Sequence, residues 1–315
     1  MNPHREIFAS RPATLRFMPK ALWPSPGWRA ERGCPDSQFI WQDYRISSRT
    51  MARLRDFAGA GEFNHDDALL LLAPHITGFR LTMALLTHPR WPLAIWRALQ
   101  FRNRLRLLGP LLLDEPSELS VQACAWRVHA KGLEVDLHTR LQQRGAVVWD
   151  SIVTVYYRGR FGAPLSHGEA HGAPSTSPTL DPSAPPVAQW RIDNGRRWEF
   201  CRLTGDYNPM HLNARYAHRM GFGGAFPHPQ RVAAQCLSHL AATGAPPRQL
   251  DLWIKGPAFF GAEATLRQAP RDDGGQDFAL WVPGEQRPAL VGSLFRALSE
   301  PRCQRERSAL RQRLA

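Results

Sequence analysis

Residues 203–211 read Leu-Thr-Gly-Asp-Tyr-Asn-Pro-Met-His. This stretch contains two turn dipeptides, Gly205-Asp206 and Asn208-Pro209. A turn there can bring the carboxylate of Asp206 to the imidazole of His211, a pair suited to general acid–base chemistry. The same residue types also suit a plain loop, in which the Asp and Asn side chains accept hydrogen bonds from backbone N–H groups and the histidine is half buried. The residues alone therefore leave catalysis and loop structure both open.

A helix is expected downstream, from His228 onward. Apolar residues recur there on one helical face, at Val232, Ala233, Cys236, Leu237 and Leu240. Pro229 fits the first helical turn, where its missing N–H is no loss to the helix. A shorter helix is predicted before it, capped by Asn213 and ended by Gly221.

The order of predicted elements occurs twice in the chain, which indicates an internal duplication. Each half has a helical stretch, a strand, a Gly-Pro break, a short turn and further alternating strands. The strands are expected at 104–108, 118–121, 133–141 and 147–157, and again at 249–255, 263–266, 278–282 and 289–298. This order is what one long helix wrapped by a curved antiparallel sheet requires. Two such α+β units would pair side by side.

The stretch 203–211 resembles the signature of the MaoC-like, (R)-specific enoyl-CoA hydratase family. That signature combines Leu, Ser or Thr, Gly-Asp-x-Asn-Pro-hydrophobic-His and a small residue six positions on, which is Ala217 here. The resemblance implies two hotdog domains packed as a pseudo-dimer in one chain, with the motif in the second. We expect an irregular N-terminal segment at 1–37, a hotdog domain without the motif at 38–161, a Gly/Pro/Ser-rich linker at 162–187, a MaoC-like hotdog domain at 188–298 and a basic tail at 299–315.

Members of this family add water across the trans-2 double bond of an acyl thioester, or remove it from the (R)-3-hydroxy compound. The resemblance implies that Asp206 is the general base toward that water. It implies that His211 orients the water and takes part in the proton transfer to C2. Gly205, Asn208 and Pro209 would support the loop. No metal and no redox cofactor is expected.

The start of the long helix departs from the family pattern. Family hydratases read His-Gly-Met there, and the glycine N–H donates to the oxyanion that forms on the thioester. This chain reads His228-Pro229-Gln230, and proline has no N–H. The N–H groups of Gln230 and Arg231, or the side-chain amide of Gln230, are the expected replacements. Two alternatives to a hydro-lyase therefore stay open: a non-catalytic acyl-thioester-binding protein and an acyl thioesterase.

The composition of the chain indicates which kinds of partner and which cellular compartment to expect. The chain has a formal net charge of +13, which suits coenzyme A or an acidic acyl carrier protein as well as a merely solvated surface. We find no basic stripe interleaved with aromatic residues, so nucleic acid is not an expected partner. The five cysteines lack C-x-x-C pairing and indicate a reducing compartment, the cytoplasm.

The longest apolar stretch, residues 69–86, is interrupted by Pro74, His75 and Arg80, so no membrane span is expected. A homodimer is compatible with this fold class.

Overall fold

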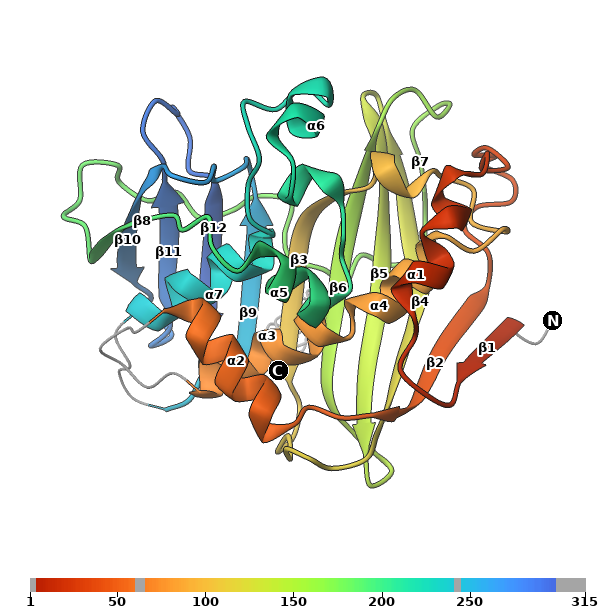
Figure 1. The fold of residues 1–315 in the computed structure, drawn as a ribbon, viewed down its shortest axis with the longest axis horizontal. Helices are drawn as coiled ribbons and strands as arrows, with labels where there is room; N and C mark the ends of the chain where they lie inside the picture. The colour runs from red at the N-terminus through yellow and green to blue at the C-terminus, as the bar shows by residue number, and fades with distance from the viewer. Residues whose placement is uncertain (1–3, 60–65, 241–244, 299–315) are drawn as a thin grey trace, which may run out of the picture.

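The computed structural model describes residues 4–59, 66–240 and 245–298. Within these residues the strands form one twelve-stranded sheet, and helices lie across one of its faces (Figure 1). The first half contributes β1 (His4–Phe8), β2 (Ser37–Tyr44), β3 (Leu99–Leu107), β4 (Ser117–His129), β5 (Gly132–Gln143), β6 (Ala146–Arg158) and β7 (Leu165–His167). The second half contributes β8 (Ala188–Arg191), β9 (Gln249–Ile254), β10 (Glu263–Pro270), β11 (Gln276–Trp281) and β12 (Leu290–Phe295).

The strand order shows the duplication directly. From the centre of the sheet outward, the first half runs β3-β6-β5-β4-β2 and the second runs β9-β12-β11-β10-β8. Corresponding positions hold corresponding strands in chain order, so the two halves repeat one topology. At the junction β3 and β9 pair antiparallel, with Arg104 opposite Asp251. The expected α+β class, two hotdog units packed as a pseudo-dimer in one chain, is confirmed.

The central helix of each unit is buried against the sheet. In the first half it comprises α3 (Asp66–Thr77) and α4 (Phe79–Leu86), which meet at Gly78. An added Cβ at Gly78 would lie 2.5 Å from the side chain of Leu119, so a larger residue does not fit at this junction. The stretch Asp66–Leu86 is long and apolar enough to cross a membrane, but most of it is buried inside the protein. It therefore packs here as a core helix.

In the second half the central helix is α7 (Pro229–His239), which begins with the proline as predicted. It contacts α2 (Ser48–Ala58) and α3 of the first half. The shorter predicted helix is α6 (Ala214–Arg219), and the side chain of Asn213 caps its N-terminus. The remaining helices are α1 (Thr14–Phe17), η1 (Pro19–Leu22), η2 (Ile95–Arg97), α5 (Arg197–Thr204) and η3 (Pro209–His211).

Arginines along β3 are already paired with carboxylates. Arg104 donates two hydrogen bonds to Asp251, at 3.0 and 2.9 Å, and so links the two halves. Arg106 donates two to Asp150, at 2.8 and 2.6 Å. A bidentate pair of this kind satisfies both charges. These arginines are therefore not available for an anionic ligand. An anion-binding surface, if the protein has one, must be formed by other basic residues.

Two segments that were expected to lack regular structure contain short elements. Segment 1–37 includes β1, which pairs parallel with β2, so the expectation of an irregular segment was wrong there. Segment 162–187 contains β7 and then packs against the sheet, where Trp253 Nε1–H donates to the carbonyl of Pro174 at 2.7 Å. The basic tail, 299–315, lies outside the described residues.

Candidate active site

The Gly-Asp-x-Asn-Pro-x-His loop begins where α5 ends. The helix stops at Gly205, whose φ of 81° places it in the left-handed region. A Cβ at this position would lie 2.5 Å from Thr14 Oγ1 and 2.6 Å from Arg80 Cγ. Both the backbone conformation and the lack of space therefore require glycine.

Hydrogen bonds between residues two positions apart then hold the turn in place. The N–H of Asp206 donates to Thr204 Oγ1 at 2.9 Å, and the N–H of Asn208 donates to Asp206 Oδ1 at 3.0 Å. The side-chain oxygen of Asn208 accepts from the Met210 N–H at 3.1 Å and caps η3, which Pro209 begins. The loop thus uses one carboxylate oxygen of Asp206 and leaves Oδ2 facing the histidines.

Three side chains converge at this point: Asp206, His211 and His228. Asp206 Oδ2 lies 3.9 Å from His211 Nε2 and 3.5 Å from His228 Nε2. The two imidazole rings are 3.8 Å apart between centroids. Their side chains are 8% and 5% exposed, whereas that of Asp206 is 17% exposed, so the carboxylate is the member of the group most open to solvent.

The hydrogen bonds assign the histidine tautomers. His211 Nδ1 lies 2.9 Å from the carbonyl oxygen of Phe226, which can only accept, so Nδ1 carries the proton and Nε2 has a lone pair toward Asp206. His228 Nε2 lies 3.1 Å from the carbonyl oxygen of Asp206 and therefore donates to it. Burial lowers the pKa of His211, against the opposing effect of the Asp206 charge. Burial and the neighbouring His211 lower the pKa of His228 well below its usual value.

This geometry suits one bridging water molecule. The 3.9 Å between Asp206 Oδ2 and His211 Nε2 is too long for a direct hydrogen bond. Two hydrogen bonds of about 2.8 Å from one oxygen atom can span it, with both acceptors free to take the water's protons. A water held this way would direct a lone pair away from the two side chains.

The same three residues also lie within the distance that a metal ion requires. Ligand atoms of Asp206, His211 and His228 are all within 4.8 Å of one another, as are those of His4, Glu6 and His88 in another part of the protein. In the first group, His228 Nε2 already donates to a backbone carbonyl and cannot offer that nitrogen to a metal. A metal ion held by all three residues would have to displace that hydrogen bond.

At the start of α7 the expected oxyanion donors differ in their availability. The Arg231 N–H donates to the carbonyl of His228 at 2.9 Å, and the Arg231 guanidinium to the carbonyl of Gly195 at 2.9 Å, so Arg231 does not serve as predicted. The Gln230 side-chain amide donates to Gln100 Oε1 at 2.7 Å. The Gln230 backbone N–H has no hydrogen-bond partner among the described residues. It is the first N–H of the helix after Pro229.

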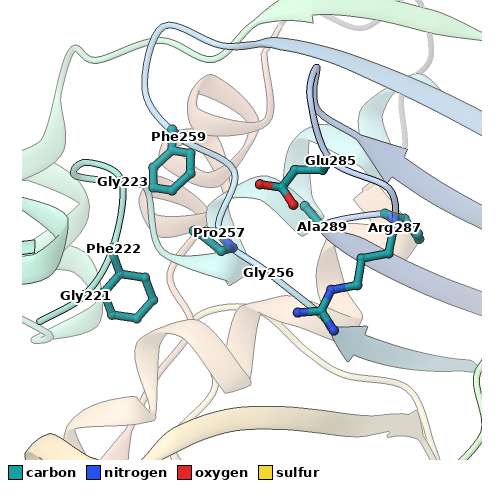
Figure 2. A pocket seen from close by; sticks show the side chains of 10 residues that line it. Gly221, Phe222, Gly223, Gly256, Pro257, Phe259, Glu285, Arg287 and Ala289 are labelled. Atoms are coloured by element: carbon teal, nitrogen blue, oxygen red, sulfur yellow. The ribbon is translucent and has the colours of Figure 1, made fainter. Parts of the chain in front are cut away.

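An open hollow lies beside this site rather than around it. Its volume is about 340 Å³, and Phe222 and Phe259 are among its lining residues, which Figure 2 shows. Both rings pack against Phe226, at 5.0 and 6.3 Å between centroids. Phe226 in turn contacts the ring of His211 at 5.2 Å. One side chain, Phe226, therefore lies between the hollow and His211.

Sequence reasoning found the Asp-His pair but missed two residues that hold it. Phe226 acts through its carbonyl, which no sequence pattern reveals. Arg80 of the first half lies beneath Gly205 and donates to the Arg202 carbonyl. An arginine inside an apolar helix was the available signal, because a buried charge needs a specific partner.

Relatives among known proteins match this fold along most of its length. No family model matches the chain. The curated 3-hydroxyacyl-thioester dehydratase X of Mycobacterium tuberculosis is 28% identical over 243 residues, which are 77% of this chain and 84% of the relative. This similarity supports the resemblance of residues 203–211 to the MaoC-like hydratase family.

Solved structures share the fold of this chain. A crystal structure of HtdX from Mycobacterium tuberculosis superposes on it with a TM-score of 0.66 at 23% identity, covering 82% of this chain and all of the other. A MaoC-like dehydratase from Phytophthora capsici gives 0.65 at 15% identity, covering 84% and 96%. The peroxisomal multifunctional enzyme type 2 of Drosophila melanogaster gives 0.60 at 16%, covering 82% of this chain and 48% of that enzyme.

Proposed function

We propose that this protein is a hydro-lyase that adds water to a trans-2-enoyl thioester, or removes it from the (R)-3-hydroxyacyl thioester. One observation carries the proposal. A carboxylate oxygen of Asp206 and an unprotonated nitrogen of His211 face each other across 3.9 Å at the end of a buried loop. The relative from Mycobacterium tuberculosis is named as a 3-hydroxyacyl-thioester dehydratase, which agrees with this chemistry.

In the hydration direction, Asp206 Oδ2 takes one proton from the bridging water as its oxygen forms the bond to C3. The electron pair of the double bond moves toward the thioester oxygen. The Asp206–His211 pair then returns one proton to C2, so that the site is regenerated. Dehydration runs through the same steps in reverse. Acid–base assistance of this kind contributes about a hundred- to ten-thousand-fold in rate.

His228 positions the carboxylate. Its Nε2–H donates to the Asp206 carbonyl and lies 3.5 Å from Oδ2, so His228 restrains the backbone and the side chain of Asp206. The negative charge that develops on the thioester oxygen would be stabilised by the Gln230 N–H at the positive end of α7. One backbone donor replaces the glycine N–H of other family members.

The proposal needs no metal and no redox cofactor. Activity is expected to survive dialysis against a chelator, followed by metal analysis of the dialysed protein. Loss of activity that zinc or magnesium restores would refute this part.

The acyl group would be carried by coenzyme A or by an acyl carrier protein. We place the protein in the cytoplasm, because the four described cysteines are free: Cys34, Cys124, Cys201 and Cys236. A homodimer is a further proposal, and sedimentation analysis of the purified protein tests it.

The decisive assay follows two products at once. Purified protein is incubated with 2-enoyl-CoA esters of several chain lengths, and the absorbance of the conjugated thioester and the free thiol are recorded together. A hydratase removes the conjugation and releases no thiol, and this activity must disappear in Asp206→Asn and His211→Gln. Release of thiol would identify a thioesterase. Tight binding without either change would identify a binding protein and refute the hydro-lyase.

A further inference from the structure

A second group of ligand-forming side chains lies at the outer edge of the first half, around β1 (Figure 1). Among the described residues β1 is the last strand at this end of the sheet and pairs only with β2. Successive side chains of a strand point to opposite faces, so His4, Glu6 and Phe8 share one face. Phe8 packs against Phe39 of the core, with 6.3 Å between ring centroids. This face of β1 is therefore turned toward the protein and presents an imidazole and a carboxylate there.

The third member of the group, His88, comes from the end of α4. Its N–H donates to the carbonyl of Leu85 at 3.2 Å. Its ring makes a T-shaped contact with Phe39 at 5.5 Å between centroids and lies 5.7 Å from the ring of His4. Because Phe39 is fully buried, the core sets the position of the His88 ring.

The distances within this group are close to those between the ligands of one metal ion. Ligand atoms of His4, Glu6 and His88 all lie within 4.8 Å of one another. Glu6 Oε2 is 3.8 Å from His88 Nε2, which is too long for a hydrogen bond. Two atoms that each bind one zinc ion at about 2.1 Å are about 3.4 Å apart in tetrahedral geometry. Small movements of the exposed His4 and the half-buried Glu6 side chains reach such separations.

The surroundings of His88 both favour and oppose a bound cation. Burial, followed by the charges of His4, Arg90 and Lys20, lowers the pKa of His88, and the neutral imidazole is the form that binds a metal. The Arg90 N–H donates to His88 Nδ1 at 3.3 Å, and a metal at Nε2 needs the proton at Nδ1, so it must displace this long hydrogen bond. The charges of Arg90 and Lys20 also repel a cation. We therefore expect moderate affinity.

We propose that His4, Glu6 and His88 form a binding site for one divalent transition-metal ion such as Zn²⁺, with water completing its coordination. Two imidazoles and one carboxylate suit Zn²⁺, whereas Mg²⁺ and Ca²⁺ prefer oxygen ligands alone. The bound ion links β1 to the end of α4 and so holds the N-terminal segment on the sheet. The proposal is independent of Asp206 and His211 and does not rest on the proposed function.

Calorimetric titration of the full chain with zinc chloride tests the site, after dialysis against a chelator and then against buffer without it. The wild-type protein should bind one zinc ion with this group. His4→Gln, Glu6→Gln and His88→Gln should each weaken the zinc affinity at least about tenfold, since even an outer partner of a metal ligand contributes about ten- to a hundredfold. His4 is exposed, so its replacement does not disturb the core. Unchanged affinity in all three variants would overturn the inference.

His171 provides a matched control. Its Nε2 lies 3.8 Å from Glu169 Oε2, the same separation as in the proposed site, but within the described part of the chain no third ligand-forming side chain joins this pair. His171→Gln should therefore leave the zinc affinity unchanged. Equal weakening in His171→Gln and His88→Gln would show that zinc binds surface histidines without selection, and would refute the site.

Two further measurements locate the ion. If zinc binding persists in the double variant His4→Gln/His88→Gln but is lost in Asp206→Asn, the ion lies in the other histidine group and the proposal is wrong. With Co²⁺ as the probe, a cobalt–thiolate absorption band would equally refute it, because a cysteine would then hold the ion.

Stability gives an independent readout. Zinc that binds the folded chain at this site should raise the urea midpoint of the wild-type protein and leave that of His4→Gln almost unchanged. An equal rise in both proteins would place the ion elsewhere.

Discussion

The variant Asp206→Asn tests whether the Asp206 side chain acts in acid–base catalysis or only holds the loop. Asparagine has the same shape as aspartate but keeps only one acceptor oxygen. The Asn208 N–H donates to Oδ1 of Asp206, so the amide oxygen is held at that position. The amide NH₂ must then take the place of Oδ2, 3.9 Å from His211 Nε2. A group that can only donate there is unable to accept the proton of the bridging water.

The expected effect on rate is large and that on stability is small. Losing acid–base assistance costs about a hundred- to ten-thousand-fold in kcat, equivalent to about 3 to 5 kcal/mol of activation free energy. The replaced oxygen lies 3.5 Å from His228 Nε2, beyond a strong hydrogen bond, and the bonds to Thr204 and Asn208 are kept. The free energy of unfolding should therefore change by no more than about 1 kcal/mol.

Hydration of a 2-enoyl-CoA and urea unfolding are measured on the same preparation. The conservative variant Asn208→Asp serves as a control for the loop, because its side chain still offers an oxygen to the Met210 N–H. If Asp206→Asn loses several kcal/mol of stability together with its activity, the residue is structural. If it keeps more than a tenth of the wild-type kcat, the base lies elsewhere.

Three further predictions concern the backbone and pH. Gly205→Ala should lower the free energy of unfolding by about 3 kcal/mol, because the left-handed backbone is strained by a Cβ and because that Cβ is crowded by its neighbours. The control is Gly145→Ala, which has a φ of 82° and nothing within 4 Å of the added Cβ, and it should lower the free energy of unfolding by only about 1 kcal/mol. Equal losses in the two variants would contradict the role of crowding at Gly205. Pro229→Gly should raise kcat up to about a hundredfold by supplying an oxyanion donor, and an unchanged kcat would count against that reading. Burial lowers the pKa of His75 to about 4. As the pH falls, His75 therefore binds a proton near pH 6.5 in the unfolded chain but only near pH 4 in the folded protein. The contribution of neutral His75 to the free energy of unfolding should be fully present above pH 6.5, and the free energy of unfolding should fall by about 3 kcal/mol by pH 4. Urea unfolding at several pH values measures this, and His75→Gln should make the pH dependence weaker.

The sequence alone predicted the repeated order of elements in the two halves and the turn at residues 203–211. Turn dipeptides at Gly205-Asp206 and Asn208-Pro209, and the repeated order of helix and alternating strands, depend on local backbone preferences and on periodic burial. Those preferences act between residues a few positions apart, so they leave a mark in the order of residues. The motif's resemblance to the MaoC-like family then added the identity of the reacting groups.

The tertiary structure alone decided how those groups are set. His228 turned out to donate to the Asp206 carbonyl, and Phe226 to fix the tautomer of His211 through its backbone. The structure also showed that the N–H of Arg231 donates to the carbonyl of His228 and its guanidinium to the carbonyl of Gly195. The Gln230 N–H is therefore the available donor. These contacts join segments that are brought together only by the packing of α7 against its neighbours. Direction and distance between such segments depend on the whole packed core, and the order of residues does not record them.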